Sequence, residues 1–170
     1  MTGQRKWRAL IIDTSSLIVL LDELGFHEHL RELSKKYDLI VTREVLEEYQ
    51  KPLPSFFQII EEPVNDVVDD VSFRGLGRGE TSVIKLSLKI IKNGFYSHVI
   101  AVSDDKRARS SCERLGVPCL GTLGIIELLK LNKIIGKLEA VKTIKFIYSY
   151  SSLYMTKSLK NKIIEKIISQ

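Results

Sequence analysis

The stretch Arg8-Ala-Leu-Ile-Ile-Asp13 decides the fold class, because a short continuous apolar run that stops at a carboxylate is typical of a strand buried on both faces. Similar short runs follow at residues 38–42, 57–61, 98–103 and 116–121. Helical patterns lie between these runs, and strands that alternate with helices predict right-handed crossovers and a mostly parallel sheet. We therefore expect a three-layer α/β/α domain.

The expected helices are marked by leucine spacing and by residues typical of helix ends. Leucines recur at helical spacing over residues 17–24, and Gly25 follows as a C-terminal cap would. Thr42 is typical of a helix N-cap. Further helices are expected over 27–36, behind Thr42, over 80–92 after the glycine-rich loop 75–79, through residue 115 and over 123–131, before a lysine-rich tail.

Length and composition favour one globular domain. The chain has 170 residues, 44% of them hydrophobic and 28% charged, which excludes a mostly disordered or collagen-like chain. The net charge of +5 lies entirely in residues 137–170, which hold seven lysines against two glutamates. A lysine-rich terminus attracts phosphate backbones or acidic partner segments, but we favour a solvated helix face as its explanation.

The sequence also predicts the compartment. No apolar run approaches the roughly 20 residues that a membrane span needs, so we expect no membrane insertion. The apolar stretch after the basic N-terminus meets Asp13 too early for a signal peptide. Only Cys112 and Cys119 occur, with no paired spacing for a metal, and we expect both to be core thiols in a cytoplasmic protein.

Acidic residues follow two of the predicted strands. Asp13 ends the first strand, and Asp104 and Asp105 end the fourth. Ligands of open parallel sheets bind outside the carboxyl ends of the strands, so these carboxylates should meet in one crevice. Several buried negative charges are costly unless a cation neutralises them. The pattern therefore predicts a divalent metal site.

Two glutamates complete the expected crevice. Glu80 directly follows Gly79 at the start of a predicted helix, which places it at the end nearest the loops. In the preceding helix, about 100° per residue leaves Glu47 nearly opposite the core and Glu48 at its boundary, which favours Glu48. All these donors are oxygens, so we expect Mg²⁺ or Mn²⁺ rather than zinc, and metal-assisted phosphodiester hydrolysis.

The acidic motifs resemble those of the PIN domain family over nearly the whole chain. They read Ile-Ile-Asp13-Thr-Ser-Ser-Leu-Ile, Val45-Leu-Glu-Glu48-Tyr, Leu76-Gly-Arg-Gly-Glu80-Thr and Val102-Ser-Asp104-Asp105-Lys-Arg-Ala-Arg. Together with Gly-Thr-Leu-Gly-Ile at 121–125, they look closest to a prokaryotic branch of that family. We accordingly expect a PIN-like catalytic part at residues 1–136 and a lysine-rich helical extension of the same domain at 137–170.

The resemblance implies a Mg²⁺- or Mn²⁺-dependent endoribonuclease like the VapC toxins of toxin–antitoxin pairs, often a homodimer and inhibited by a partner antitoxin. The metal ligands that it implies are Asp13, Glu48, Glu80 and either Asp104 or Asp105, because family members differ in which of these last two positions holds the acid. It also implies Ser15 and Ser103 as hydroxyl neighbours of the ligands.

Basic residues flank the predicted crevice. Phosphates on either side of the scissile bond are expected to contact four of them, namely Arg78, Lys106, Arg107 and Arg109, although solvated helix charges explain them equally well. Four aromatic residues lie in the tail, namely Phe146, Tyr148, Tyr150 and Tyr154. We interpret them as facing the core or a second chain, in preference to stacking on bases.

Two other readings start from the same residues. Phosphotransfer enzymes also place an aspartate after a first buried strand, but Ser15 stands where the phosphatase pattern requires a second aspartate. A non-catalytic PIN-like module that binds RNA or a protein would not need the acids together. Replacement of Asp13 by asparagine separates the readings, because it should abolish cutting and leave binding intact.

Overall fold

The computed structural model describes residues 8–61 and 70–170, and its centre is a five-stranded parallel sheet. The strands lie in the order β3-β2-β1-β4-β5. They are β1 (Arg8–Ile12), β2 (Asp38–Thr42), β3 (Phe57–Ile60), β4 (His98–Val102) and β5 (Cys119–Leu120). All four pairings between neighbours are parallel, which confirms the sheet that the sequence predicts.

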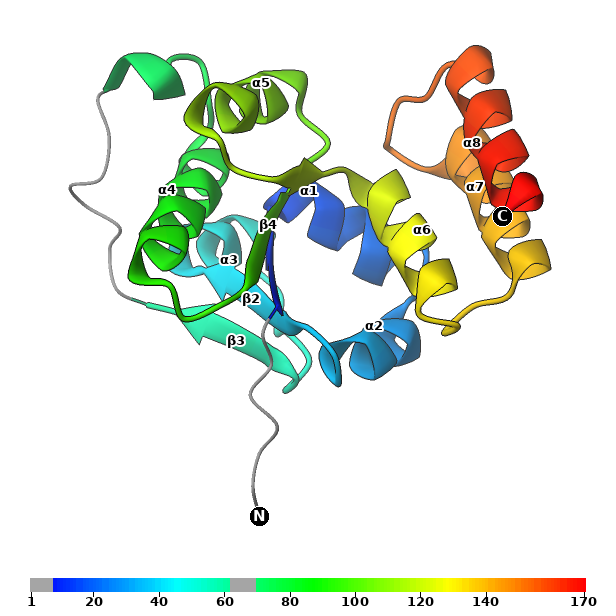
Figure 1. Ribbon diagram of the computed structural model, residues 1–170, viewed down its shortest axis with the longest axis horizontal. Helices are drawn as coiled ribbons and strands as arrows, with labels where there is room; N and C mark the ends of the chain where they lie inside the picture. Colours follow the sequence, from blue (N-terminus) through cyan, green and yellow to red (C-terminus); the bar gives the residue numbers. More distant parts are fainter. Residues whose placement is uncertain (1–7, 62–69) are drawn as a thin grey trace.

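Helices cover both faces of this sheet. They are α1 (Thr14–Leu17), the π-helix η1 (Ile18–Glu23), α2 (His27–Ser34), α3 (Arg43–Tyr49), the 3₁₀ turn η2 (Asp70–Phe73), α4 (Arg78–Asn93), α5 (Lys106–Leu115), α6 (Thr122–Leu131), α7 (Lys137–Tyr150) and α8 (Lys157–Ser169). Figure 1 shows α4 and α5 on one side of the sheet and α1, α2 and α6 on the other. The three-layer α/β/α architecture is therefore confirmed.

The central strand β1 positions the crevice. Its residues from Ala9 to Ile12 have no exposed surface, as expected for a strand covered on both faces. Ile12 pairs with Val102 in β4, and the Asp13 amide donates to the Val102 carbonyl at 3.0 Å. The two strands consequently end side by side, and the acids that follow them start from neighbouring points.

Two helix starts differ from the sequence prediction. The first helical segment begins at Thr14 rather than Leu17, because the Asp13 side chain caps it by accepting from the Ser16 amide. The helix after the glycine loop begins at Arg78 rather than Glu80. Glu80 consequently lies inside the first turn and accepts from the Gly77 amide, which is otherwise unpaired at a helix start.

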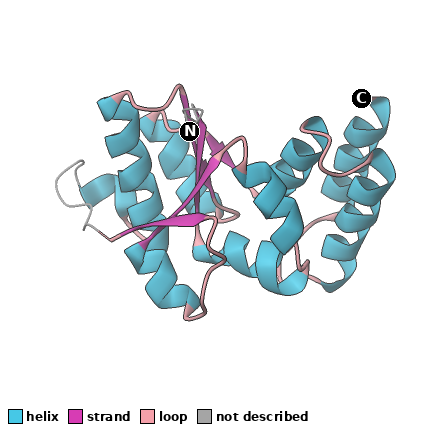
Figure 2. Ribbon diagram, turned by 90° about the horizontal axis from the view of Figure 1, so that it is seen from below, coloured by secondary structure: helices cyan, strands magenta, loops and turns pink. Residues whose placement is uncertain are grey.

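The C-terminal residues form two packed helices beyond α6. Helix α7 packs on α6 and α8, with Ile144, Ile147 and Ile167 buried between them, and Figure 2 shows the pair at one end of the molecule. The tail aromatics are exposed, up to 78% for Tyr150 and 82% for Tyr154, so they do not face the core of this chain, and a contact with a second chain stays a prediction. Apolar burial in this tail is carried by its isoleucines instead.

Two smaller predictions concern the thiols and the membrane. Cys112 is buried, whereas Cys119 is only partly buried, and both are free. In the part of the chain that the structure describes, none of the helices has the length and apolar character to span a bilayer.

Candidate metal centre

Five carboxylates gather around the carboxyl ends of β1 and β4. They are Asp13 after β1, Glu48 on α3, Glu80 in the first turn of α4, and Asp104 and Asp105 after β4. The sheet order places β1 and β4 next to each other, and α3 packs against both α1 and α4. The fold thus brings together the acids that the sequence predicts from four separate segments.

Asp13 is the buried member of the group, with 1% of its surface exposed. Burial raises the pKa of its carboxyl group, hydrogen bonds from Ser103 and Ser16 oppose that rise, and the negative charge of Asp104 adds to it. The Ser15 hydroxyl lies 3.2 Å from both carboxylate oxygens. Ser15 and Ser103, the predicted hydroxyl neighbours, therefore both lie beside Asp13.

The structure places Glu48, and not Glu47, at the crevice. Glu48 accepts from the Thr14 hydroxyl at 2.6 Å and from the Gly79 amide at 2.9 Å, which ties it to α1 and α4. Glu47 points elsewhere and pairs with Arg43 at 3.0 Å and with Arg78 at 3.5 Å. These contacts favour Glu48 as the functional residue of the pair.

Glu80 lies within the electrostatic reach of three other acids. Burial raises the pKa of its carboxyl group, the hydrogen bond from the Gly77 amide lowers it, and the charges of Asp105, Asp13 and Glu48 raise it further. Such mutual repulsion is what a bound cation relieves, and perturbed carboxylates of this kind indicate a functional site.

Asp104 and Asp105 face different neighbours. Asp104 accepts from the backbone amide of Thr122 at 2.8 Å and from the Thr122 hydroxyl, and it lies 3.4 Å from the Ser16 hydroxyl. Asp105 caps α5 by accepting from the Ala108 amide at 2.9 Å. Asp104 is thereby held toward Asp13 and α6, whereas Asp105 acts electrostatically on Glu80.

The donor chemistry of the group fits a hard divalent cation. Every side chain in it offers oxygen, the ligand that Mg²⁺ and Mn²⁺ prefer. In the described residues, no three Asp, Glu, His or Cys side chains converge closely enough to enclose an ion. Mg²⁺ needs no such cage, since it is usually held by one or two carboxylates and keeps several waters.

Four residues support the acids without having been predicted from the sequence. Thr14 and Gly79 hold Glu48, while Ser16 and Thr122 contact Asp104. Each neighbours a predicted residue or a glycine in the sequence, but which carboxylate it reaches depends on how α1, α3, α4 and α6 pack. The sequence showed only that these residues lie next to predicted ones, and that position does not identify which carboxylate each of them contacts.

The predicted phosphate-binding cations separate into two groups. Arg78 is paired with Glu47, so its charge is partly neutralised. Lys106, Arg107 and Arg109 lie exposed in the first turns of α5, directly after Asp105. The α5 cations are therefore the better placed to meet an anionic substrate near the acids.

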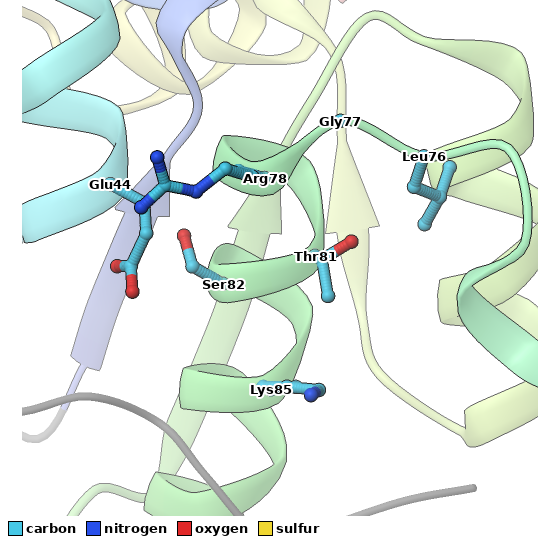
Figure 3. A pocket seen from close by; sticks show the side chains of 7 residues that line it. All are labelled: Glu44, Leu76, Gly77, Arg78, Thr81, Ser82 and Lys85. Atoms are coloured by element: carbon cyan, nitrogen blue, oxygen red, sulfur yellow. The ribbon is translucent and has the colours of Figure 1, made fainter. Parts of the chain in front are cut away.

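A pocket of about 220 Å³ lies beside the acidic group. Figure 3 shows Glu44 and Arg78 at one side of α4, Leu76 at the other, and Lys85 further along the helix. Thr81, Ser82 and Gly77 complete the lining, and none of the five carboxylates contributes to it. The pocket thus adjoins the acidic crevice without containing it.

A comparison with protein families identifies a match to this chain. A protein-family model described as a PIN domain matches residues 9–169, which is almost the whole chain. No curated protein matches the sequence. The matched region includes every acid of the group and both C-terminal helices.

Proposed function

This chain belongs to the PIN domain family, whose members are generally nucleases, and on that basis we propose that it is a metal-dependent endoribonuclease hydrolysing RNA phosphodiester bonds. The observation that carries the proposal is the group of five carboxylates, in which burial and mutual repulsion raise the pKa of both Asp13 and Glu80. Carboxyl groups with perturbed pKa values are found more often at functional sites than elsewhere.

The chain's own residues would act in three ways, because they would hold the metal ion, keep the carboxylates in place and position the RNA. Asp13, Glu48 and Glu80, with Asp104 and Asp105, would hold a Mg²⁺ or Mn²⁺ ion. Such an ion, when bound, supplies the Lewis acidity that phosphodiester hydrolysis needs without a protein nucleophile.

Neighbouring residues would keep the carboxylates in place and position the RNA. The Ser15 and Ser103 hydroxyls orient Asp13 by donating hydrogen bonds to it. Lys106, Arg107 and Arg109, with Arg78 on the other side, would hold phosphates next to the scissile bond. This arrangement leaves the choice of RNA sequence to the surfaces around the crevice.

The biological setting is part of the same proposal. The motif resemblance supports a VapC-like toxin of the cytoplasm that acts as a homodimer and is inhibited by an antitoxin protein. Residues 1–136 would form its catalytic part, and residues 137–170 a helical extension of the same domain. The exposed rings of Phe146 and Tyr150, whose centroids lie 5.3 Å apart on α7, support a contact surface on that extension.

A second candidate is a PIN-like module that binds RNA or a protein without cutting. The exposed cations Lys106, Arg107 and Arg109 on α5 are the observation that favours it, because they suit RNA binding with or without cutting. Retention of five coupled carboxylates favours the nuclease, because a binding module gains nothing from their repulsion.

One assay separates the two candidates. Purified protein free of any antitoxin is incubated with RNA of mixed sequence in Mn²⁺, in Mg²⁺ and in EDTA, beside Asp13→Asn. The nuclease proposal predicts cutting that requires the metal and is lost in Asp13→Asn, while RNA binding persists. A folded wild-type protein that binds the metal and leaves all RNA intact would favour the binding module.

A further inference from the structure

A second pocket lies beside α5, and four of its six described lining residues are cations. It measures about 320 Å³ and is formed by Arg74, Lys106, Arg107, Ser110, Ser111 and Arg114. None of these described lining residues is acidic. Four positive charges around one cavity favour an anion.

Backbone carbonyls hold two of these arginines in place. Arg107 donates to the Gly75 carbonyl at 3.3 Å, and Arg114 donates to the Ser72 carbonyl at 3.4 Å and to the Ser111 hydroxyl at 3.0 Å. Ser111 is 2% exposed and itself donates to the Ser72 carbonyl at 2.8 Å. A neutral carbonyl orients a guanidinium without cancelling its charge, and most of its five N–H donors stay available.

Three other arginines pair with carboxylates. Arg43 and Arg78 both pair with Glu47, and Arg31 pairs with Glu28. Among the side chains that the structure describes, at residues 8–61 and 71–170, no carboxylate lies within ion-pair distance of Arg74, Lys106, Arg107 or Arg114. These described carboxylates therefore do not neutralise the four cations.

The pocket is lined by residues of the helix that follows Asp105 of the acidic group. Helix α5 starts directly after Asp105, and Arg107 and Arg114 lie seven residues apart, or about 10 Å along the helix axis at about 1.5 Å per residue. A strand whose phosphate lies at the acids must continue on one side of them, and α5 offers a row of cationic donors there. Arginine forks match the oxygens of a phosphate in pairs.

We propose that the pocket between α5 and the 72–75 turn binds a backbone phosphate of the RNA strand beside the scissile phosphate, with Arg74 and Arg114 as binding residues. The proposal rests on the proposed nuclease function for the identity of the strand. It extends the binding surface beyond Lys106 and Arg107 to two arginines that lie outside the acidic motifs in sequence.

The test measures RNA binding rather than cutting. A labelled single-stranded RNA of mixed sequence is titrated with the full chain in EDTA at several salt concentrations, and the slope of log K against log salt is determined. The variants are Arg74→Gln, Arg114→Gln and the double variant. Arg31→Gln on α2 is the matched control, because it removes one charge from an arginine outside the pocket, and melting curves check that each variant is folded.

The expected result is a slope reduced by about 0.7 in the double variant, which loses the contact to one phosphate, with binding weakened on the order of tenfold. Arg31→Gln should keep the wild-type slope. Arg114→Lys should keep most of the slope, because it retains the charge and loses only the fork geometry.

Unchanged slopes in the folded double variant would overturn the phosphate site, as would a wild-type protein that does not bind RNA. A glutamate-rich peptide that binds the wild type and not the double variant, while RNA slopes stay unchanged, would overturn it in favour of an acidic protein partner. Cleavage in Mn²⁺ is scored separately. If only the phosphate-site proposal is wrong, the protein cuts RNA but the salt slopes of the variants are unchanged. If only the nuclease proposal is wrong, the salt slopes change but no RNA is cut.

Discussion

The backbone amide of Gly79 donates to the carboxylate of Glu48 at 2.9 Å and thereby fixes an acid of α3 against the first turn of α4. The two residues approach so closely that a Cβ atom on Gly79 would lie 2.5 Å from Oε2 of Glu48. Position 79 therefore favours glycine because the Glu48 carboxylate occupies the place of a Cβ atom, and not because of the backbone conformation.

Gly79→Ala should displace the Glu48 carboxylate. We expect metal-dependent RNA cleavage to fall about tenfold or more, because a small misplacement of a catalytic group is costly. Gly136→Ala is the matched control, since its Cβ would have nothing within 4 Å and its φ of −82° suits alanine. Cleavage rates and melting curves of both variants check the prediction. Wild-type activity in a folded Gly79→Ala protein would contradict the role given to this contact.

Asp13→Asn should stabilise the metal-free protein while removing activity. The buried carboxylate is costly when ionised, and asparagine caps a helix as well as aspartate does. We expect Tm in EDTA at neutral pH to rise by roughly 2–4 °C, the size that about 1 kcal/mol produces in a chain of this length. A lower Tm than the wild type under these conditions would show that the Asp13 charge supports the fold.

The same carboxyl group predicts a pH dependence with a definite sign. The pKa of Asp13 is raised above its ordinary 3.8, mainly by burial, so the unfolded chain releases this proton at lower pH than the folded one. The free energy of unfolding therefore falls as pH rises through the window above 3.8, and Asp13→Asn removes that fall. The Tm values of the wild type and of Asp13→Asn in EDTA should therefore diverge as pH rises across this window. Added Mg²⁺ should narrow the difference between the two Tm values. Parallel curves would contradict the burial of an ionisable Asp13.

Thr122→Val should loosen Asp104. The buried Thr122 hydroxyl donates to Asp104, and valine keeps the shape of the side chain without that donor. A hydrogen bond to a charged group is worth about 1.5–3 kcal/mol, so we expect a lower Tm and a reduced affinity for Mn²⁺. Thr122→Ser, which restores the hydroxyl, should recover both. Calorimetric titration with Mn²⁺ measures the affinity, and equal affinities in Thr122→Val and the wild type would remove Thr122 from the positioning residues.

Much of the fold follows from the sequence because buried parallel strands leave a simple signature. The run from Arg8 to Asp13 predicted β1 correctly, and Asp13 follows the carboxyl end of that central strand. The choice of Glu48 over Glu47 followed from helical periodicity, and the contacts of both side chains agree with it.

The rest depended on contacts between distant segments, which periodicity does not contain. The pairing of Arg78 with Glu47 partly neutralises a cation that the sequence placed beside the substrate. The sequence did not separate a core-facing from a partner-facing position for Tyr150 and Tyr154, because an aromatic stripe has the same spacing in both cases, and the structure excludes the core. Arg74 and Arg114 lie about 40 residues apart in sequence and share a pocket only through the packing of α5 on the η2 segment.

Cleavage by the pair of variants Glu48→Gln and Glu47→Gln tests the central claim most directly. Both substitutions remove one charge from neighbouring residues of α3, but only Glu48 reaches Thr14 and Gly79 at the crevice. The account predicts that Glu48→Gln loses cutting of mixed-sequence RNA in Mn²⁺ while Glu47→Gln keeps it, with no cutting by any form in EDTA. Equal activity in the two variants, or wild-type cutting that persists in EDTA, would contradict the carboxylate centre proposed for this protein.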